Sequence, residues 1–266
     1  MKAVNYIIGR PRQGEARRIA RRADANRPYR LIVCVLAALT IGAPSLLAVD
    51  LTAVTQSGVS FVLAEVAEER AALTLTVRDT PATLNDPIVS IMGFASLPRL
   101  TDLRIHHAPL IVSYDFLSQA VNLETLVISF GRVDDISFIK NLPDLRVFVL
   151  EFCDDWESDI GLPFLVEPLD FRLNRQLEYV GFRLCSLSAL PKFIEPPESL
   201  KLFDLSFNHL IIRENDSEVL DSYGFLDGIF LEGNLVNPDI LESYTFIMLD
   251  NSTQNLAEFL DSDDTE

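Results

Sequence analysis

A spacing of apolar residues that recurs after 22 residues constrains this chain more than any other feature. Residues 123–153 read LETLVISFGRVDDISFIKNLPDLRVFVLEFC. Apolar residues occupy the first, fourth and sixth positions of a unit that starts at Leu123, and the spacing restarts at Leu145. Apolar residues at positions four and six lie on one face of a short strand. Because one such unit cannot bury that face alone, the pattern predicts a stack of similar units.

The pattern recurs over most of the chain. Numbering positions from the first apolar residue, we expect seven units, which start at Ala72, Leu100, Leu123, Leu145, Leu177, Leu200 and Leu226. The intervals between starts are 28, 23, 22, 32, 23 and 26 residues, and the longest contains an insertion within residues 154–176. Position nine is asparagine in two units, at Asn208 and Asn234, and cysteine in two others.

Two segments, VDDISFIKNLPDLRVFVL (133–150) and LKLFDLSFNHL (200–210), resemble the leucine-rich repeat family in its short variety of about 22 residues. The resemblance covers roughly residues 71–240. It implies a solenoid with a curved parallel sheet on the concave side, and short helices and 3-10 turns on the convex side. It also implies protein–protein recognition on the concave sheet, without naming the partner.

The remaining segments are expected to frame the repeats. We expect residues 50–70 to form an N-terminal cap, in which 61–70 shields the first repeat and has few strand features. Residues 241–266 are expected to form a C-terminal cap and an acidic tail. Residues 1–30 are expected to be a basic cytoplasmic leader, and the uncharged residues 31–49 either the apolar core of a signal peptide or a transmembrane anchor.

The charge of the chain is strongly asymmetric. Residues 1–49 carry Lys2 and eight arginines against Glu15 and Asp24, a balance of +7. A basic start followed by an apolar run is typical of export, whereas a basic nucleic-acid-binding arm would leave the apolar run unexplained. The other 13 basic and 37 acidic residues give residues 50–266 a balance of −24. This domain should repel nucleic acid and anionic lipid, so membrane contact is expected only through the N-terminal apolar segment.

Positions five and eight of the repeats are expected to line the concave sheet or its rim. From the first unit to the last, position eight reads Asp79, His107, Phe130, Phe152, Leu184, Phe207 and Gly233. Position five reads Thr76, Arg104, Val127, Val149, Gly181, Asp204 and Phe230. We predict that seven of these form a protein-binding surface: Val127, Phe130, Val149, Phe152, Leu184, Phe207 and Phe230. The alternative is that position eight lies under the following loop and extends the core, since a shift of one residue exchanges the faces.

Cys153 and Cys185 occupy position nine in consecutive repeats. Stacking would bring their Cα atoms to about 5 Å, which is within range of a disulfide. Cysteine is also an accepted residue at this position without any bridge. The sequence therefore leaves two alternatives open, a disulfide and two thiols.

No residue pattern in the chain indicates catalysis, a cofactor or a metal. There is no Gly-rich phosphate loop, Cys-x-x-Cys pair or His-Glu-x-x-His stretch. His106 and His107 are adjacent on an expected strand, so they point to opposite faces and cannot bind one ion together. The acidic residues between Glu151 and Asp159 are interpreted as a solvated loop.

We therefore expect a non-enzymatic, exported module that binds a protein, located in the periplasm, on the cell surface or anchored in a membrane. The alternative is an intracellular scaffold resembling the leucine-rich repeat subunits that regulate phosphatases.

Overall fold

The computed structural model describes residues 48–77, 86–107, 111–153 and 168–248. The strands are β1 (Ala48–Thr55), β2 (Ser60–Ala67), β3 (Ala72–Thr76), β4 (Ile88–Met92), β5 (Asp102–His106), β6 (Thr125–Ser129), β7 (Val147–Glu151), β8 (Tyr179–Arg183), β9 (Leu202–Asp204), β10 (Ile211–Ile212), β11 (Gly228–Phe230), β12 (Leu235–Val236) and β13 (Ile247–Met248). The 3-10 helices are η1 (Phe94–Ser96), η2 (Asp115–Gln119), η3 (Ser137–Asn141) and η5 (Glu214–Asp216), and the α-helices are α2 (Ser217–Asp221) and α3 (Pro238–Ser243).

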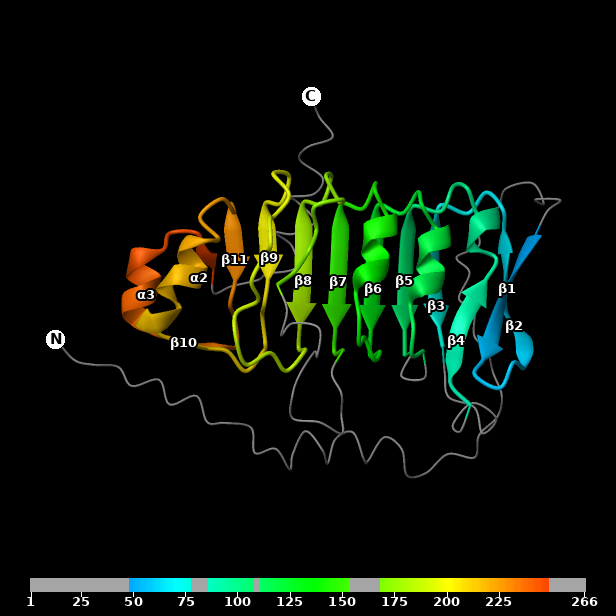
Figure 1. Ribbon diagram of the computed structural model, residues 1–266, viewed down its shortest axis with the longest axis horizontal. Helices are drawn as coiled ribbons and strands as arrows, with labels where there is room; N and C mark the ends of the chain where they lie inside the picture. Colours follow the sequence, from blue (N-terminus) through cyan, green and yellow to red (C-terminus); the bar gives the residue numbers. More distant parts are fainter. Residues whose placement is uncertain (1–47, 78–85, 108–110, 154–167, 249–266) are drawn as a thin grey trace. The chain divides into compact units, whose positions relative to one another are not determined.

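One parallel sheet of eight strands forms the repeat domain, in the order β13-β11-β9-β8-β7-β6-β5-β3 (Figure 1). Equivalent positions of neighbouring repeats are paired: Leu126 lies opposite Phe148, and Ile128 opposite Leu150. All four of these side chains are fully buried. The alternation at positions four and six therefore sets the buried face of the sheet, as the sequence predicts.

Short helices cover the buried face of the sheet. Helices η2 and η3 contribute Phe116 and Phe138 to the core. Phe138 packs edge-on against Phe148 of β7, and Phe148 packs edge-on against Phe182 of β8. A parallel sheet stacked in sequence order, with one short connection per repeat crossing the same face, is a leucine-rich repeat solenoid.

Residues 48–67, where an N-terminal cap is expected, form a β-hairpin, which corrects the expectation that residues 61–70 have few strand features. Strands β1 and β2 are antiparallel, and β1 also pairs with β4, which lies in the long first repeat. Leu51 and Ala53 are fully buried in the core of the repeat domain. Strand β1 begins at Ala48, so the last residues of the uncharged segment 31–49 belong to this cap.

The opening repeat is in a register two residues earlier than its spacing predicts. Leu73 of β3 pairs with Leu103 of β5, and Leu75 with Ile105, which makes them positions four and six. Val77 then occupies position eight and is buried, whereas Asp79 lies outside the described residues. A shift of two residues keeps the same side chains on the same faces, so the alternation alone does not exclude it.

The C-terminal end of the domain is closed by α2, α3 and the short strand β13. Strand β13 extends the sheet by pairing with β11. Tyr244, at the end of α3, donates a hydrogen bond to Asp221 of α2 over 2.8 Å. Nothing further along the chain than Met248 is described, so the expected acidic tail lies outside the described residues.

Candidate functional site

Position eight, which lies beyond the carboxyl end of each strand, is left-handed in six consecutive repeats. The φ angles of His107, Phe130, Phe152, Leu184 and Phe207 lie between 53° and 58°, and that of Gly233 is 73°. Each of the five non-glycine residues donates its backbone N–H to the position-seven carbonyl of the next repeat, as Phe130 does to Glu151 over 2.9 Å. A left-handed conformation costs a side-chain-bearing residue roughly 1–2 kcal/mol, and glycine much less. The backbone of these repeats therefore places large side chains where it would favour glycine or asparagine.

These side chains form a stacked column at the carboxyl ends of the strands. The ring centroids of Phe130 and Phe152 are 4.5 Å apart with an interplanar angle of 7°, and His107 stacks on Phe130 at 4.9 Å. Phe130, Phe152 and Leu184 are half-buried, and Phe207 is 39% exposed. We call Phe130, Phe152, Leu184 and Phe207 the apolar strip. It is neither sealed in the core nor fully in solvent.

The three position-five residues that were predicted to bind a partner differ in their exposure. Val127 and Val149 are half-buried on the concave face, beside the apolar strip. Phe230 is only 6% exposed, because it packs in a second apolar cluster with Tyr179 and Leu202. Of the seven residues predicted to bind a partner, Phe230 is the least accessible. The structure thus brings together the predicted residues of the middle repeats and buries the one from the last repeat.

A pair of polar residues on the concave face was missed by the sequence analysis. The Tyr179 hydroxyl donates to the carboxylate of Asp204 over 2.8 Å, and both residues are buried. Burial raises the pKa of Tyr179 well above its ordinary value, and the charge of Asp204 raises it further. The ring can lie across the sheet because Gly181 has no side chain; a Cβ there would be 3.2 Å from the ring. The only sign of this pair in the sequence was Gly181 itself. Position five is valine in the two preceding repeats and aspartate in the following one.

The charged side chains of the sheet are paired with one another. Arg183 lies between Glu151 at 3.6 Å and Asp204 at 3.4 Å. At the opposite edge of the strands, Arg146 contacts Glu178 at 2.9 Å. In an earlier repeat, Arg104 contacts Asp102 at 3.3 Å. These ion pairs frame the middle of the concave face, where the partly exposed side chains of Val127, Val149 and the apolar strip are apolar.

Cys153 and Cys185 are both buried and both are thiols in the structure, so the disulfide alternative is not the one observed. The Cys153 thiol lies 3.3 Å from the carbonyl oxygen of Ile128, and the Cys185 thiol 3.4 Å from that of Leu150. Each thiol thereby contacts the position-six carbonyl of the preceding repeat. The cysteines connect adjacent repeats without a covalent bond.

The histidines do not converge on an ion site. His106 ends β5, whereas His107 is exposed and stacks on Phe130. Burial, with His107 and Arg104 nearby, lowers the pKa of His106. Within the described ranges, no group of three or more His, Cys, Asp or Glu side chains is placed to hold a metal. Most of the acidic cluster that begins at Glu151 lies outside those ranges. The helices of the described part of the chain are all too short or too polar to span a membrane.

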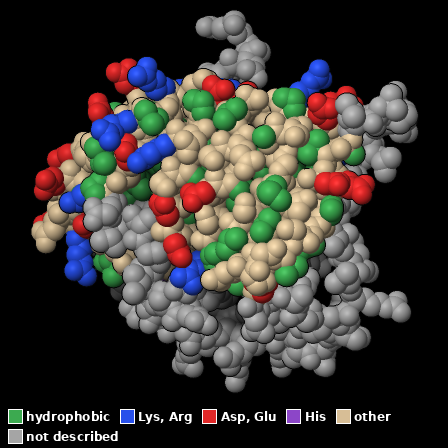
Figure 2. Space-filling model, turned by 45° about the vertical axis from the view of Figure 1, so that its right-hand side comes forward, with side chains coloured by type: hydrophobic (Ala, Val, Ile, Leu, Met, Phe, Trp, Pro, Cys, Tyr) green, Lys and Arg blue, Asp and Glu red, His purple; other side chains and the backbone are tan. Residues whose placement is uncertain are grey.

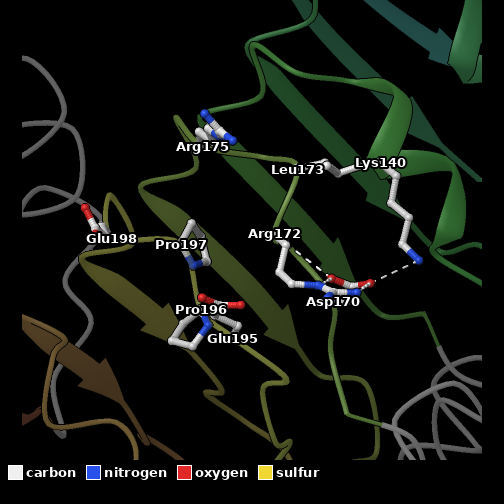
Figure 3. Close-up of a pocket in the computed structure, with 9 residues that line it drawn as sticks. All are labelled: Lys140, Asp170, Arg172, Leu173, Arg175, Glu195, Pro196, Pro197 and Glu198. Carbon is white, nitrogen blue, oxygen red and sulfur yellow. Dashed lines mark hydrogen bonds and ion pairs between the residues drawn. The ribbon is translucent and has the colours of Figure 1, made fainter.

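An open groove of about 780 Å³ lies between the segments 170–175 and 195–198 and helix η3 (Figure 3). Asp170 accepts from Arg172 at 2.8 Å and contacts Lys140 at 3.3 Å. The Arg172 guanidinium holds the pKa of Asp170 well below its ordinary value. The groove is lined by three basic and three acidic side chains, so its charge favours neither anions nor cations. The face in Figure 2 likewise carries charges of both signs, with hydrophobic side chains scattered in small groups.

The chain was compared with known proteins and with solved structures. No protein-family model and no curated protein matches the sequence. Among solved structures, the chain is similar to an internalin (inlF) from Listeria monocytogenes, with 18% sequence identity and a TM-score of 0.39. The match covers 71% of this chain and 57% of the internalin, so this chain spans little more than half of that protein's length. The fold assignment rests on the strand register and the repeated hydrogen bonds described above.

Proposed function

We propose that this chain is a non-enzymatic interaction module that binds a protein partner through the apolar strip and the neighbouring valines Val127 and Val149. The observation that carries the proposal is the column of large, partly exposed apolar side chains in left-handed conformation. A residue that costs backbone energy and is only half-buried contributes less to stability than a core residue of the same size. Contact with a partner would complete its burial.

The surroundings of the strip favour an apolar contact. Glu151 and Arg183 adjoin the strip, and they are paired with each other. Interfaces commonly have an aromatic or aliphatic centre surrounded by polar residues that exclude water. Here Phe130 and Phe152 would be the anchors, and the paired charges the rim.

Replacing the two central anchors tests the proposal. Phe130→Asp combined with Phe152→Asp should abolish capture of the partner, because two carboxylates would be buried in an apolar contact. The matched control is Val112→Asp combined with Val121→Asp, which changes two valines that are 41% and 47% exposed outside the strip. The control should retain the partner. Circular dichroism and thermal melting establish whether each variant folds, and a strip variant that does not fold would place these rings in the core.

We also propose that the repeat domain is exported, either released after signal cleavage or anchored. Support comes from the sequence alone: the balance of +7 in residues 1–49 precedes an apolar run, and the domain after it is strongly acidic. Protease added to intact cells should digest the domain if it is on the surface. Digestion only after opening the outer envelope would indicate a periplasmic location. Digestion only after release of the cytoplasm would contradict export.

A further inference from the structure

The spacing of the apolar strip indicates what kind of partner segment fits it. We propose that the strip binds an amphipathic α-helix of the partner protein, with basic residues beside its apolar face. This inference rests on the proposed function, because it concerns the same surface. It adds the conformation and the charge of the segment that binds there.

The first argument is the distance between successive side chains. The stacked rings are 4.5 and 4.9 Å apart, which is the separation of neighbouring strands. An α-helix laid across the strands presents one apolar side chain about every 5.4 Å along its axis. An extended segment presents side chains on one face about every 6.6 Å. The helix therefore matches the column of rings more closely at each step.

The mismatch accumulates along the strip. From Phe130 to Phe207 there are three steps between strands, about 14 Å in total. Three helical turns span about 16 Å, and three steps of an extended segment about 20 Å. Over this length the side chains of a helix stay within about 2 Å of the rings. Those of an extended segment are displaced by about 6 Å, which is more than the distance between two strands.

The second argument is charge complementarity. Position seven, which adjoins the strip, carries Glu151 and Arg183 in the middle repeats, and Glu232 occupies the same position in the last repeat, beyond the strip. Arg183 is shared between Glu151 and the buried Asp204, so the charge that attracts a basic segment is that of the domain as a whole. Residues 50–266 as a whole have a balance of −24. A helix with lysine or arginine beside its leucine-like stripe is attracted to such a surface, and an acidic helix is repelled.

The width of the site is consistent with one helix. Val127 and Val149 form a second apolar row on the concave face, separated from the strip by position seven. An apolar stripe on a helix occupies three or four positions in every two turns. Such a stripe is wide enough to contact both rows.

The test uses the full chain and three synthetic 16-residue peptides of identical leucine and lysine composition. The first has leucines at helical spacing, the second alternates leucine and lysine, and the third has a scrambled order. Fluorescence anisotropy should show that the first peptide binds at least tenfold more tightly than the other two. Circular dichroism of the complex should show the first peptide as a helix.

The same variants distinguish the outcomes. Phe130→Asp with Phe152→Asp should weaken the first peptide at least tenfold, and Val112→Asp with Val121→Asp should leave its affinity unchanged. If the alternating peptide binds equally tightly and depends on the two phenylalanines, the helix is excluded while the apolar strip remains the binding surface. If no peptide depends on Phe130 and Phe152, any binding is through charge alone and the inference is overturned. The proposed function fails separately, when capture of the natural partner is unaffected by the double substitution.

Discussion

The middle repeats and the last repeat both have a positive φ at position eight, but they differ in the residues at positions eight and nine. The last repeat has Gly233 and Asn234, whereas the repeat that starts at Leu145 has Phe152 and Cys153. Glycine adopts a positive φ without steric cost, and the asparagine side chain both donates and accepts hydrogen bonds. The last repeat therefore has the residues that the backbone favours. The middle repeats do not, which indicates that their residues serve something other than the backbone.

Position nine shows the difference in hydrogen bonds, because the repeat that starts at Leu200 shares an asparagine there with the last repeat, although its position eight is Phe207. The Asn208 amide donates to the carbonyls of Phe182 and Leu205 at 2.7 and 2.8 Å, and its oxygen accepts from the backbone N–H of Cys185 at 2.9 Å. The Cys153 thiol reaches the carbonyl of Ile128 as a weak donor. Both residues fix a repeat to its predecessor. The asparagine does so with a stronger donor and an additional acceptor.

Removing the asparagine should have the largest effect on stability. Asn208→Ala leaves buried carbonyl and N–H groups without their side-chain partner, at about 1–3 kcal/mol for each unsatisfied group. We expect a loss of at least about 3 kcal/mol in the free energy of unfolding, measured by urea denaturation. Cys185→Ala is the matched change in the middle repeats and should cost about 1 kcal/mol, since it removes a weak donor and a small volume. Equal losses in the two variants would show that the thiol holds its repeat as firmly as the amide does.

Changing the glycine should have the next largest effect. A Cβ on Gly233, whose φ is 73°, would lie 2.5 Å from Cδ1 of Phe207 and 3.1 Å from its Cα. Gly233→Ala should therefore lower the free energy of unfolding by about 2 kcal/mol, through backbone strain and displacement of the Phe207 ring. Gly58→Ala is the control, because Gly58 also has a positive φ and its Cβ would meet nothing within 4 Å. If both variants lose the same amount in urea denaturation, the Phe207 ring moves aside freely and the end of the strip is not fixed.

The sequence predicted the parts of this fold that depend on local spacing. Alternation at Leu126 and Ile128 determined the buried face, because successive strand side chains point to opposite sides. It did not determine the register of the first repeat, where Leu73, Leu75 and Val77 alternate equally well from either start. The N-terminal hairpin was missed because residues 61–67 pair with β1, across a turn that the repeat pattern does not include.

The sequence placed the residues of the strip at one position of the repeat but did not predict their geometry. The spacing placed Phe130 and Phe152 in one column, and the structure stacks them. It gave no sign of the positive φ that follows each strand, because neither phenylalanine nor leucine indicates a left-handed residue. The burial of Phe230 depends on Tyr179 and Leu202, which come from two other repeats. Contacts between repeats of this kind are set by side-chain shape across the sheet, which spacing along the chain does not record.

Of these substitutions, Phe152→Asn should have the smallest effect on stability but a large effect on partner binding. Phe152→Asn places a residue that tolerates a left-handed conformation at φ 53°, which relieves about 1 kcal/mol of backbone strain. It also removes the stacking on Phe130, worth about 0.5–1.5 kcal/mol, and the partial burial of the ring, so a small net loss remains. We expect the free energy of unfolding to fall by about 1 kcal/mol, and the affinity for the partner to fall at least tenfold. A large loss of stability with unchanged affinity would mean that Phe152 is there for packing, and the contrast between the middle and last repeats would then reflect the core and not a partner.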